Sequence, residues 1–462
     1  MLNGGLPRLD GMDEGQRIGL LVRRAGFGPR PGELDGYRQL GWDATLHQLL
    51  NPADTADQSL EDLLGTLQGS LLDLQNLEDV QTWWLYRMLQ TQRPLQEKLT
   101  LFWHGHFAVA NYKVGNPRLM HQHLDLLRGG ALGVFDDLLL GVSKDPAMLI
   151  WLDGATNRKA APNENYGREL LELFTLGIGN YTEDDVKAAA RAFTGWNLRN
   201  GTTFFFDPNQ HDAGNKVFLG REGELDGGDI LSIVADHPAA ARRIAGKLFA
   251  FFAYPNPEPD VLDSLAQTYL DSGHDIRAVV EAIFNSPAFV SDRSLYEHVK
   301  SPVEYVVGTV RALNATVRER ELIPALRLLG QEILNPPNVA GWPGGVNWIN
   351  PSTLLTRYNF ATRAAFAQGQ PNDGGSVDAQ QVLGISNLDD AGAAADSVLQ
   401  SLGNLALSPQ AHQALVDYIQ SPLTYPPGFN GKPNPTQAQA ATDARLRAAL
   451  VLALSSSDYQ VG

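Results

Sequence analysis

Apolar residues recur every three or four positions along most of this chain, the spacing that gathers them on one face of an α-helix. The stretch RIGLLVRR at residues 17–24 shows this pattern and is followed by AGFGPRPGEL, whose Gly and Pro end a helix. The same periodicity predicts further helices at residues 31–40, 43–50, 79–92, 95–104, 118–127, 134–142, 166–175, 183–194, 238–252, 259–272, 276–284, 295–312, 321–331, 352–367 and 435–455. We therefore predict a mainly α protein with a large multi-helix body.

Strand signals are confined to one region of the chain. TTFFF at residues 202–206 and the apolar residues 217–219 are predicted to pair as a small β-hairpin around the loop DPNQHDAGNK. The stretch NPPNVAGWPGGVNWIN at residues 335–350 is rich in Pro, Gly and Trp, which suits a long ordered packing loop better than a linker.

Two polar, Gly- and Pro-rich stretches, at residues 368–380 and 421–437, read as surface insertions or hinges. They suggest a division of the chain. We predict a main helical domain at residues 1–367, which carries the polar motifs, and a C-terminal helical segment at residues 368–462 packed on the same body.

The composition excludes several classes of function. The formal net charge is −16, so a phosphate-rich partner would be repelled, and we predict no nucleic-acid partner. The basic residues Arg242, Arg243 and Lys247 read as the solvated face of a helix. The chain has no cysteine, which excludes disulfides, thiolate metal sites and cysteine nucleophiles.

Targeting signals are absent from the sequence as it stands. Residues 1–19, MLNGGLPRLDGMDEGQRIG, lack a basic region followed by an apolar run, and no segment has the roughly 20 apolar residues of a membrane span. We expect a soluble protein without a transmembrane segment. It would be exported, to the periplasm or cell surface, if a signal peptide has been removed, and cytoplasmic otherwise.

The stretch PNENYGRELLELFTLGIGNYTEDDV at residues 162–186 carries the densest set of polar side chains. Glu169 and Glu172 are three residues apart and share a helix face, as a metal site or an acid–base pair requires. The alternative is structural, with these carboxylates paired to Arg168 or Arg191 inside a helix-packing network.

Histidines gather in a second motif, FWHGHF. His104 and His106 would lie about 200° apart on a helix, so they could hold one ion only if Gly105 breaks that helix. Hydrogen bonding of a buried histidine to the backbone is the alternative. His121 and His123, just downstream, read as part of an ordinary surface helix.

The third motif is HDAGNK. His211 and Asp212 offer a possible pair of metal ligands, and Lys216 offers a mobile cation for a carboxylate or phosphate of a substrate. The loop could equally be a turn without a function. Asp153 and Asn157, which precede the first motif, are expected to lie near it in space.

The remaining sequence signals for a function are weaker or absent. Trp342 and Trp348 could stack on a sugar ring, although aromatic residues in such loops more often fill a core. The chain has no G-x-S-x-G elbow, P-loop, H-E-x-x-H helix, or G-x-G-x-x-G after a strand, which removes most standard hydrolase, nucleotide-binding and dehydrogenase functions.

Taken together, the blocks LTLFWHGHFAV, DPAMLIWLDGATNRKAAPNENYGRELLELFTLGIGNYTEDDVKAAARAFTGW, HDAGNKVFLG, LNPPNVAGWPGG and WINPSTLLTRYNF resemble the bacterial family of domains of unknown function 1800. The likeness runs from LLVRRAGFGPRP to the closing LALSSSDYQV. It implies an exported protein that works beside a sulfatase-like partner protein. The family supplies no catalytic residues to transfer.

The leading hypothesis from these motifs is a metal-dependent enzyme, hydrolytic or oxidative, whose three polar blocks meet in space. It assigns Zn, Mn or Fe to nitrogen and oxygen ligands, with Glu172 as general base and Lys216 as the anchor for substrate charge; the ligands would be His104, His106, Glu169, His211 and Asp212. One alternative is a non-catalytic scaffold or surface protein that acts with a partner. Another is carbohydrate binding through Trp342 and Trp348.

Overall fold

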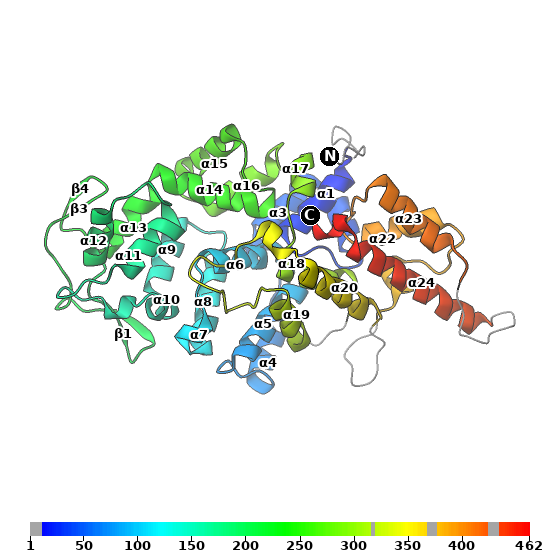
Figure 1. The fold of residues 1–462 in the computed structure, drawn as a ribbon, viewed down its shortest axis with the longest axis horizontal. Helices are drawn as coiled ribbons and strands as arrows, with labels where there is room; N and C mark the ends of the chain where they lie inside the picture. Colours follow the sequence, from blue (N-terminus) through cyan, green and yellow to red (C-terminus); the bar gives the residue numbers. More distant parts are fainter. Residues whose placement is uncertain (1–11, 316–318, 367–376, 424–433) are drawn as a thin grey trace.

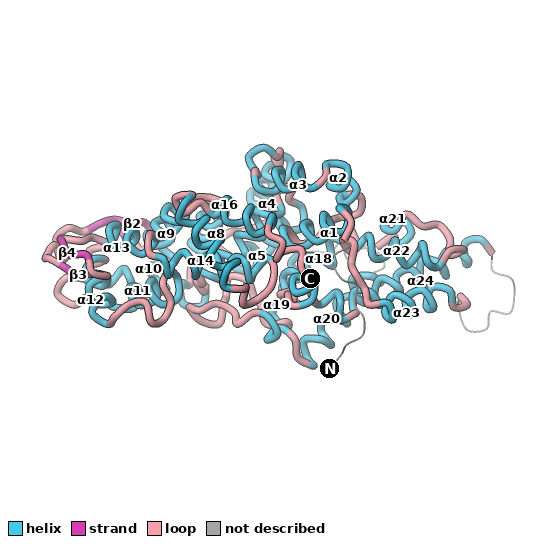
Figure 2. The backbone as a smooth tube through the Cα atoms, turned by 90° about the horizontal axis from the view of Figure 1, so that it is seen from above, coloured by secondary structure: helices cyan, strands magenta, loops and turns pink. Residues whose placement is uncertain are grey.

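The computed structural model describes residues 12–315, 319–366, 377–423 and 434–462. It confirms a mainly α protein, in which helices form an elongated body and the few strands lie at one end (Figure 1). The view from above shows the same order, with α21 to α24 at the other end (Figure 2). None of the described helices is both long enough and apolar enough to cross a lipid bilayer.

The elements of the first half, in chain order, are α1 (Glu14–Ala25), α2 (Glu33–Leu40), α3 (Trp42–Leu50), η2 (Pro52–Asp54), α4 (Gln58–Ser70), α5 (Leu77–Gln90), α6 (Pro94–His106), α7 (Asn111–Val114), α8 (Pro117–Gly129), α9 (Phe135–Lys144), α10 (Pro146–Trp151), η3 (Gly154–Thr156), α11 (Glu164–Glu169), the π-helix η4 (Leu170–Thr175), α12 (Glu183–Ala192), β1 (Trp196–Arg199), β2 (Thr203–Phe206), β3 (Lys216–Phe218) and β4 (Arg221–Gly223).

The second half contains α13 (Gly227–Ala235), α14 (Pro238–Phe252), α15 (Pro259–Asp271), α16 (Ile276–Asn285), α17 (Asp292–Tyr296), α18 (Pro302–Ala312), η5 (Glu319–Glu321), α19 (Leu322–Leu328), η6 (Gly345–Trp348), α20 (Pro351–Phe366), α21 (Ala379–Leu383), α22 (Ala391–Ser401), α23 (Pro409–Gln420), α24 (Pro435–Ser455) and α25 (Ser457–Gln460).

Two apolar cores hold these helices together. The larger one joins α6, α9, α14 and α16, and includes Trp103 and Phe249. The second joins α5, α18, α20 and α24, and includes Phe360 and Leu446. Side chains from both of the predicted parts of the chain thus share the second core. The predicted boundary between residues 367 and 368 lies outside the described residues, as do parts of both predicted insertions.

Helix bounds follow the sequence most closely where capping residues and proline mark a start. α14 and α24 begin at a proline in the first helical turn and have the bounds that the periodicity predicted. The predicted helix at residues 295–312 is wrong in the segment between Tyr296, where α17 ends, and Pro302, where α18 begins. Ser301 and Glu304 form a capping box around Pro302, so a new helix begins there.

The strands form two separate hairpins, β1 with β2 and β3 with β4, so the predicted pairing of residues 202–206 with 217–219 is wrong. Each hairpin closes locally. Asn200 and Gly201 have φ values of 52° and 72° in the first turn, and Leu219 and Gly220 have 47° and 77° in the second. Left-handed residues of this kind match the twist of a tight hairpin.

Candidate functional site

The two histidines of α6 face opposite sides of an unbroken helix. α6 continues through Gly105 to His106, so the condition for a shared ion is not met. Nε2 of His104 accepts a hydrogen bond from the Leu334 amide at 3.0 Å. Nε2 of His106 lies 3.0 Å from the carbonyl oxygen of Phe174 and donates to it. The two side chains therefore point in different directions, as the predicted angle of about 200° between them requires, and each ring has its own partner.

His104 belongs to the interior of the protein. Its side chain is fully buried, and its ring meets the edges of Trp84 and Trp342 at centroid distances of 5.4 Å. Burial, and after it the nearby His123, lower the pKa of His104 to about 3. The imidazole is thus neutral and positions the aromatic residues around it.

The carbonyl that binds His106 is available because of the π-helix η4. Wider i→i+5 bonding in η4 leaves main-chain oxygens at its end for other donors. The guanidinium of Arg243 donates to the oxygen of Leu173 at 3.1–3.2 Å, and His106 donates to that of Phe174. The helix that carries Glu172 therefore orients two basic side chains through its backbone.

Lys247 of α14 completes this arrangement. Its Nζ lies 3.1 Å from Nδ1 of His106, which accepts the hydrogen bond because the ring proton is on Nε2. Burial, and after it the charge of Arg243, lower the pKa of Lys247 from 10.5 to about 7. Burial and then Lys247 likewise hold the pKa of His106 well below its usual value. No carboxylate among the described residues forms an ion pair with Lys247.

Lys247 and His106 open on a cleft of about 600 Å³ between α6, α14, the start of α18 and the loop before α20. In Figure 1 this loop, coloured yellow, runs beside α6. The lining residues are mostly apolar and aromatic: Leu101, Phe102, Gly105, His106, Lys247, Ala250, Phe251, Pro255, Glu297, His298, Val299, Ser301, Glu304, Gln331, Ala340, Trp342, Pro343, Gly344, Gly345, Val346, Asn347 and Trp348. A few polar groups in an apolar cleft are typical of a small-molecule site.

The Trp-rich loop closes the cleft by touching the histidine motif. Gly341 has a φ of 78°, and a Cβ there would lie 2.3 Å from the oxygen of Gly105, so only glycine fits. A Cβ on Gly105 itself would meet no atom within 4 Å, and this residue lines the cleft. Trp348 is buried, whereas Trp342 is partly exposed and offers an aromatic surface to a ligand.

A buried ionic group lies at the far wall of the cleft. The carboxylate of Glu304 binds the ammonium of Lys98 and lies 3.2 Å from Nε2 of His298. Burial raises the pKa of Glu304, but Lys98 and His298 outweigh it and hold that pKa well below its usual value. Glu304 is therefore charged and already paired, unlike Lys247.

The predicted partners of Glu169 and Glu172 are wrong. Arg168 pairs with Glu164 and Glu183. Arg191 pairs with Asp212 of the HDAGNK loop. The carboxylate of Glu172 instead accepts a hydrogen bond from the hydroxyl of Tyr181 at 3.0 Å. Burial and then Glu172 raise the pKa of Glu169, as expected for two carboxylates on one face without a cation between them.

The side chains of HDAGNK are engaged within their own end of the molecule. Asp212 accepts two hydrogen bonds from Arg191, at 2.7 and 3.2 Å, and this contact lowers the pKa of Asp212 to about 2. Nδ1 of His211 lies 2.8 Å from the oxygen of Thr194. Lys216 is buried, and its Nζ donates to two main-chain oxygens, so the prediction of a mobile cation is wrong.

These segments lie apart along the long axis of the molecule. Figure 1 shows α12, β3 and β4 at one end, whereas α6 lies nearer the middle. Among the described residues, no group of three or more His, Asp or Glu side chains is arranged to hold a metal ion. The binding of Zn, Mn or Fe by His104, His106, Glu169, His211 and Asp212 stays a prediction.

Two weaker predictions have different outcomes. Asp153 and Asn157 do lie beside the first motif: the side chain of Asn163 donates to the oxygen of Asp153, and Asn157 accepts from the Asn163 amide. The assignment of His123 to a surface is wrong. His123 is fully buried, with Nδ1 3.0 Å from the carboxylate of Asp145.

Lys247 was missed because α14 was interpreted as a helix with a solvated basic face. Arg242 fits that interpretation, since it is exposed and pairs with Asp263. Lys247 instead stands in the apolar stretch IAGKLFAFF, on a helix that has no acidic residue to pair with it. An unpaired lysine among large apolar residues was the signal in the sequence.

Comparison with known proteins identifies the family of the chain. A family model described as "Protein of unknown function (DUF1800)" matches residues 20–461. Searches of curated proteins and of solved structures find no match.

Proposed function

Since the chain belongs to this family of proteins of unknown function, we propose a function from the geometry of the cleft. The protein is a lysine-dependent enzyme that binds a small aldehyde or ketone and forms an imine with it through Nζ of Lys247. One observation carries the proposal: Nζ lies in the cleft, 3.1 Å from a neutral imidazole, with no carboxylate partner among the described residues.

The amine of such a lysine is available at neutral pH. With a pKa of about 7, about half of the Lys247 side chains are unprotonated there, against on the order of one in a thousand for an ordinary lysine. Only the unprotonated amine is a nucleophile. Desolvation beside another cation is a known way to activate a lysine for imine formation.

The neighbouring imidazole supplies the proton acceptor. When Nζ attacks the carbonyl carbon, a C–N bond forms and the nitrogen becomes positively charged. Nδ1 of His106 is the acceptor within reach for the proton that this nitrogen loses. His106 returns this proton to the carbinolamine oxygen, and a second proton, from solvent, lets the C–O bond break so that the oxygen leaves as water. This gives an iminium that withdraws electrons from the adjacent carbon. The carbonyl oxygen of Phe174 holds the ring proton on Nε2, so that Nδ1 is the acceptor before the attack and again once its proton has been returned.

The walls of the cleft favour an apolar or aromatic substrate. Trp342, Phe251 and Phe102 line the cleft together with Lys247, and aromatic faces contact apolar groups of a ligand more favourably than charged ones. Glu304 is paired with Lys98, and Glu297, the other acidic residue in the lining, is paired with Arg293, so neither carboxylate neutralises Lys247.

Reductive trapping tests this proposal. The protein is incubated with 4-hydroxybenzaldehyde and sodium cyanoborohydride, and modified peptides are located by mass spectrometry. We expect saturable modification of Lys247 at low aldehyde concentration and its loss in Lys247→Met. Lys187, which is exposed and paired with Asp184, is the internal control for unselective reaction. Equal labelling of Lys187 and Lys247 would contradict the proposal.

Carbohydrate binding is a second candidate, because Trp342 and Trp348 line this same cleft. A sugar ring would stack on the exposed face of Trp342. Asn347 and Glu297, which also line the cleft, would bind its hydroxyl groups. Oligosaccharides would then quench tryptophan fluorescence in the wild type but not in Trp342→Ala. Binding without labelling of Lys247 would favour this function over imine chemistry.

A further inference from the structure

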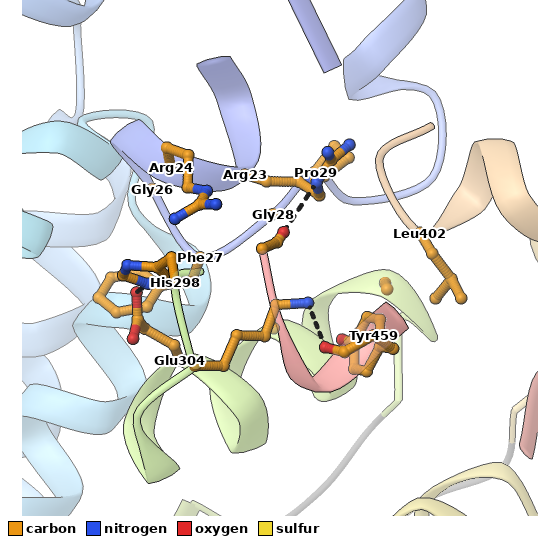
Figure 3. Close-up of a pocket in the computed structure, with 14 residues that line it drawn as sticks. Arg23, Arg24, Gly26, Phe27, Gly28, Pro29, His298, Glu304, Leu402 and Tyr459 are labelled. Atoms are coloured by element: carbon orange, nitrogen blue, oxygen red, sulfur yellow. Dashed lines mark hydrogen bonds and ion pairs between the residues drawn. The ribbon is translucent and has the colours of Figure 1, made fainter. Parts of the chain in front are cut away.

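A second, smaller cavity shares His298 and Glu304 with the cleft. Figure 3 shows the residues that line it. Its volume is about 20 Å³. The walls come mainly from α1, from the segment that leads into α18, and from the last residues of the chain, and they include Arg23, Arg24, His298, Lys300, Glu304 and Tyr459.

Three cationic side chains on these walls are bound only by main-chain oxygens. Arg23 donates to the oxygens of Gly403, Asn404 and Gly462, and Lys300 donates to that of Tyr459 at 2.8 Å. Arg24 likewise donates to the oxygens of Ala253 and Ser294. All three side chains are buried. Carbonyl dipoles solvate a cation but do not neutralise its charge.

Negative charge on the walls is scarce. Glu304 is the one acidic side chain among the lining residues, and it is already bound to Lys98 and His298. Even a negative charge on Gly462, which accepts from Arg23, would leave the cations in excess. The pKa values agree with this imbalance: burial lowers the pKa of Arg23 to about 10 and that of Arg24 to about 9, and holds that of Lys300 well below its usual value.

One donor on the wall has no acceptor. Nε of Arg24 is buried and makes no hydrogen bond to any described residue, although Arg24 is only 2% exposed. Buried donors of charged groups are almost always satisfied, because leaving one unpaired costs several times more than a hydrogen bond gains. The missing acceptor thus belongs to a residue that lines the cavity in which negative charge is scarce.

We infer that this cavity binds a small monovalent anion of the chloride type. A cavity of about 20 Å³ exceeds the roughly 10–15 Å³ that one water needs and offers little room for a polyatomic anion such as phosphate. An ion there would accept from Arg24 and neutralise charge shared with Arg23 and Lys300. It would fasten α1 to the segment before α18 and to Tyr459. The inference does not depend on Lys247.

Replacement of the anion at constant ionic strength tests the inference. Thermal unfolding is followed while sodium chloride is exchanged for sodium gluconate, whose anion is too large for the cavity. We expect the melting temperature to rise saturably with chloride and the rise to vanish in Arg24→Met. Arg242→Met, at an exposed ion pair, should keep the full chloride response. An identical melting temperature in both salts would overturn the inference.

Diffraction gives a second test that needs no variant. Crystals of the wild type are grown or soaked in sodium bromide, and anomalous scattering locates bromide. A bromide peak between Arg24 and Lys300 supports the anion site even if Arg24→Met fails to fold. A cavity without anomalous density at a bromide concentration that gives peaks elsewhere on the protein overturns it.

Discussion

Nζ of Lys247 and Nδ1 of His106 lie 3.1 Å apart, although 141 residues separate them in the chain. Their approach depends on a third segment, since the carbonyl oxygen of Phe174 fixes the imidazole tautomer that accepts from the amine. The stretch at residues 162–186 thus contacts His106 through the backbone of η4 rather than through Glu169 and Glu172.

The low pKa of Lys247 links protein stability to pH. Because the folded-state pKa lies below the unfolded value, folding releases a proton between pH 7 and 10.5, and stability rises over this range. We expect Lys247→Met to be more stable than the wild type at pH 7, with an advantage that shrinks by at most about 1.4 kcal/mol per pH unit above it. Urea unfolding at several pH values measures the difference. Lys187→Met, at an exposed site, should show no such trend.

Gly105 is expected to keep the cleft open and to lower the stability of α6. Its added Cβ meets no neighbour and α6 is helical there, so Gly105→Ala should stabilise the protein by about 0.5–1 kcal/mol. Gly105→Phe should fill the cleft and reduce aldehyde labelling of Lys247. The matched control is Gly341→Ala, which should destabilise because its Cβ would collide with the oxygen of Gly105. Denaturant unfolding of the three variants checks this; a destabilising Gly105→Ala would count against an open cleft at this position.

Glu169 is expected to oppose folding rather than support it. Burial and the neighbouring Glu172 raise the pKa of Glu169, so its charged form is disfavoured in the folded protein. Stability therefore falls as the pH rises from the pKa of the unfolded state to the higher pKa of the folded state. Glu169→Gln should therefore stabilise by about 0.2–0.5 kcal/mol at pH 7, the scale of a like-charge pair on a helix. Glu183→Gln, which removes the partner of Arg168, should not stabilise. A strong loss of stability in Glu169→Gln, measured by thermal unfolding, would restore the idea of a buried ion pair.

The HDAGNK loop offers a direct comparison between a structural ion pair and a metal ligand. Asp212→Asn leaves Arg191 without its carboxylate, and we expect a loss of about 0.5–1 kcal/mol for this partly exposed pair. The loss should be the same in EDTA and in zinc chloride. Stabilisation of the wild type by zinc that disappears in Asp212→Asn would instead support the predicted metal site.

The sequence predicts those parts of the fold that are set locally. Pro435 and its capping residue Asn434 define the start of α24, and the helical angle between His104 and His106 follows from their spacing alone. The true hairpin could also have been found, because Asn200-Gly201 is a strong local turn signal.

The burial of a side chain by segments that are distant in the sequence could not be predicted from the sequence alone. Lys247 could be singled out as a lysine in an apolar stretch without an acidic neighbour, but its contact with His106 and the cleft around it depend on η4 and on the loop at residues 340–348. The burial of His123 likewise depends on Asp145 from another helix. Export and a sulfatase-like partner, which the family resemblance implies, stay predictions.

The central claim is that the pKa of Lys247 lies near 7, so that about half of its amines are unprotonated at neutral pH. Its most direct test is an NMR titration of the protein after reductive ¹³C-methylation, with Lys247→Met used to assign the resonance. We predict a pKa near 7 for Lys247, which moves upward in Arg243→Gln because a repelling charge is removed. A pKa of about 10, the value of an exposed lysine, would contradict the account.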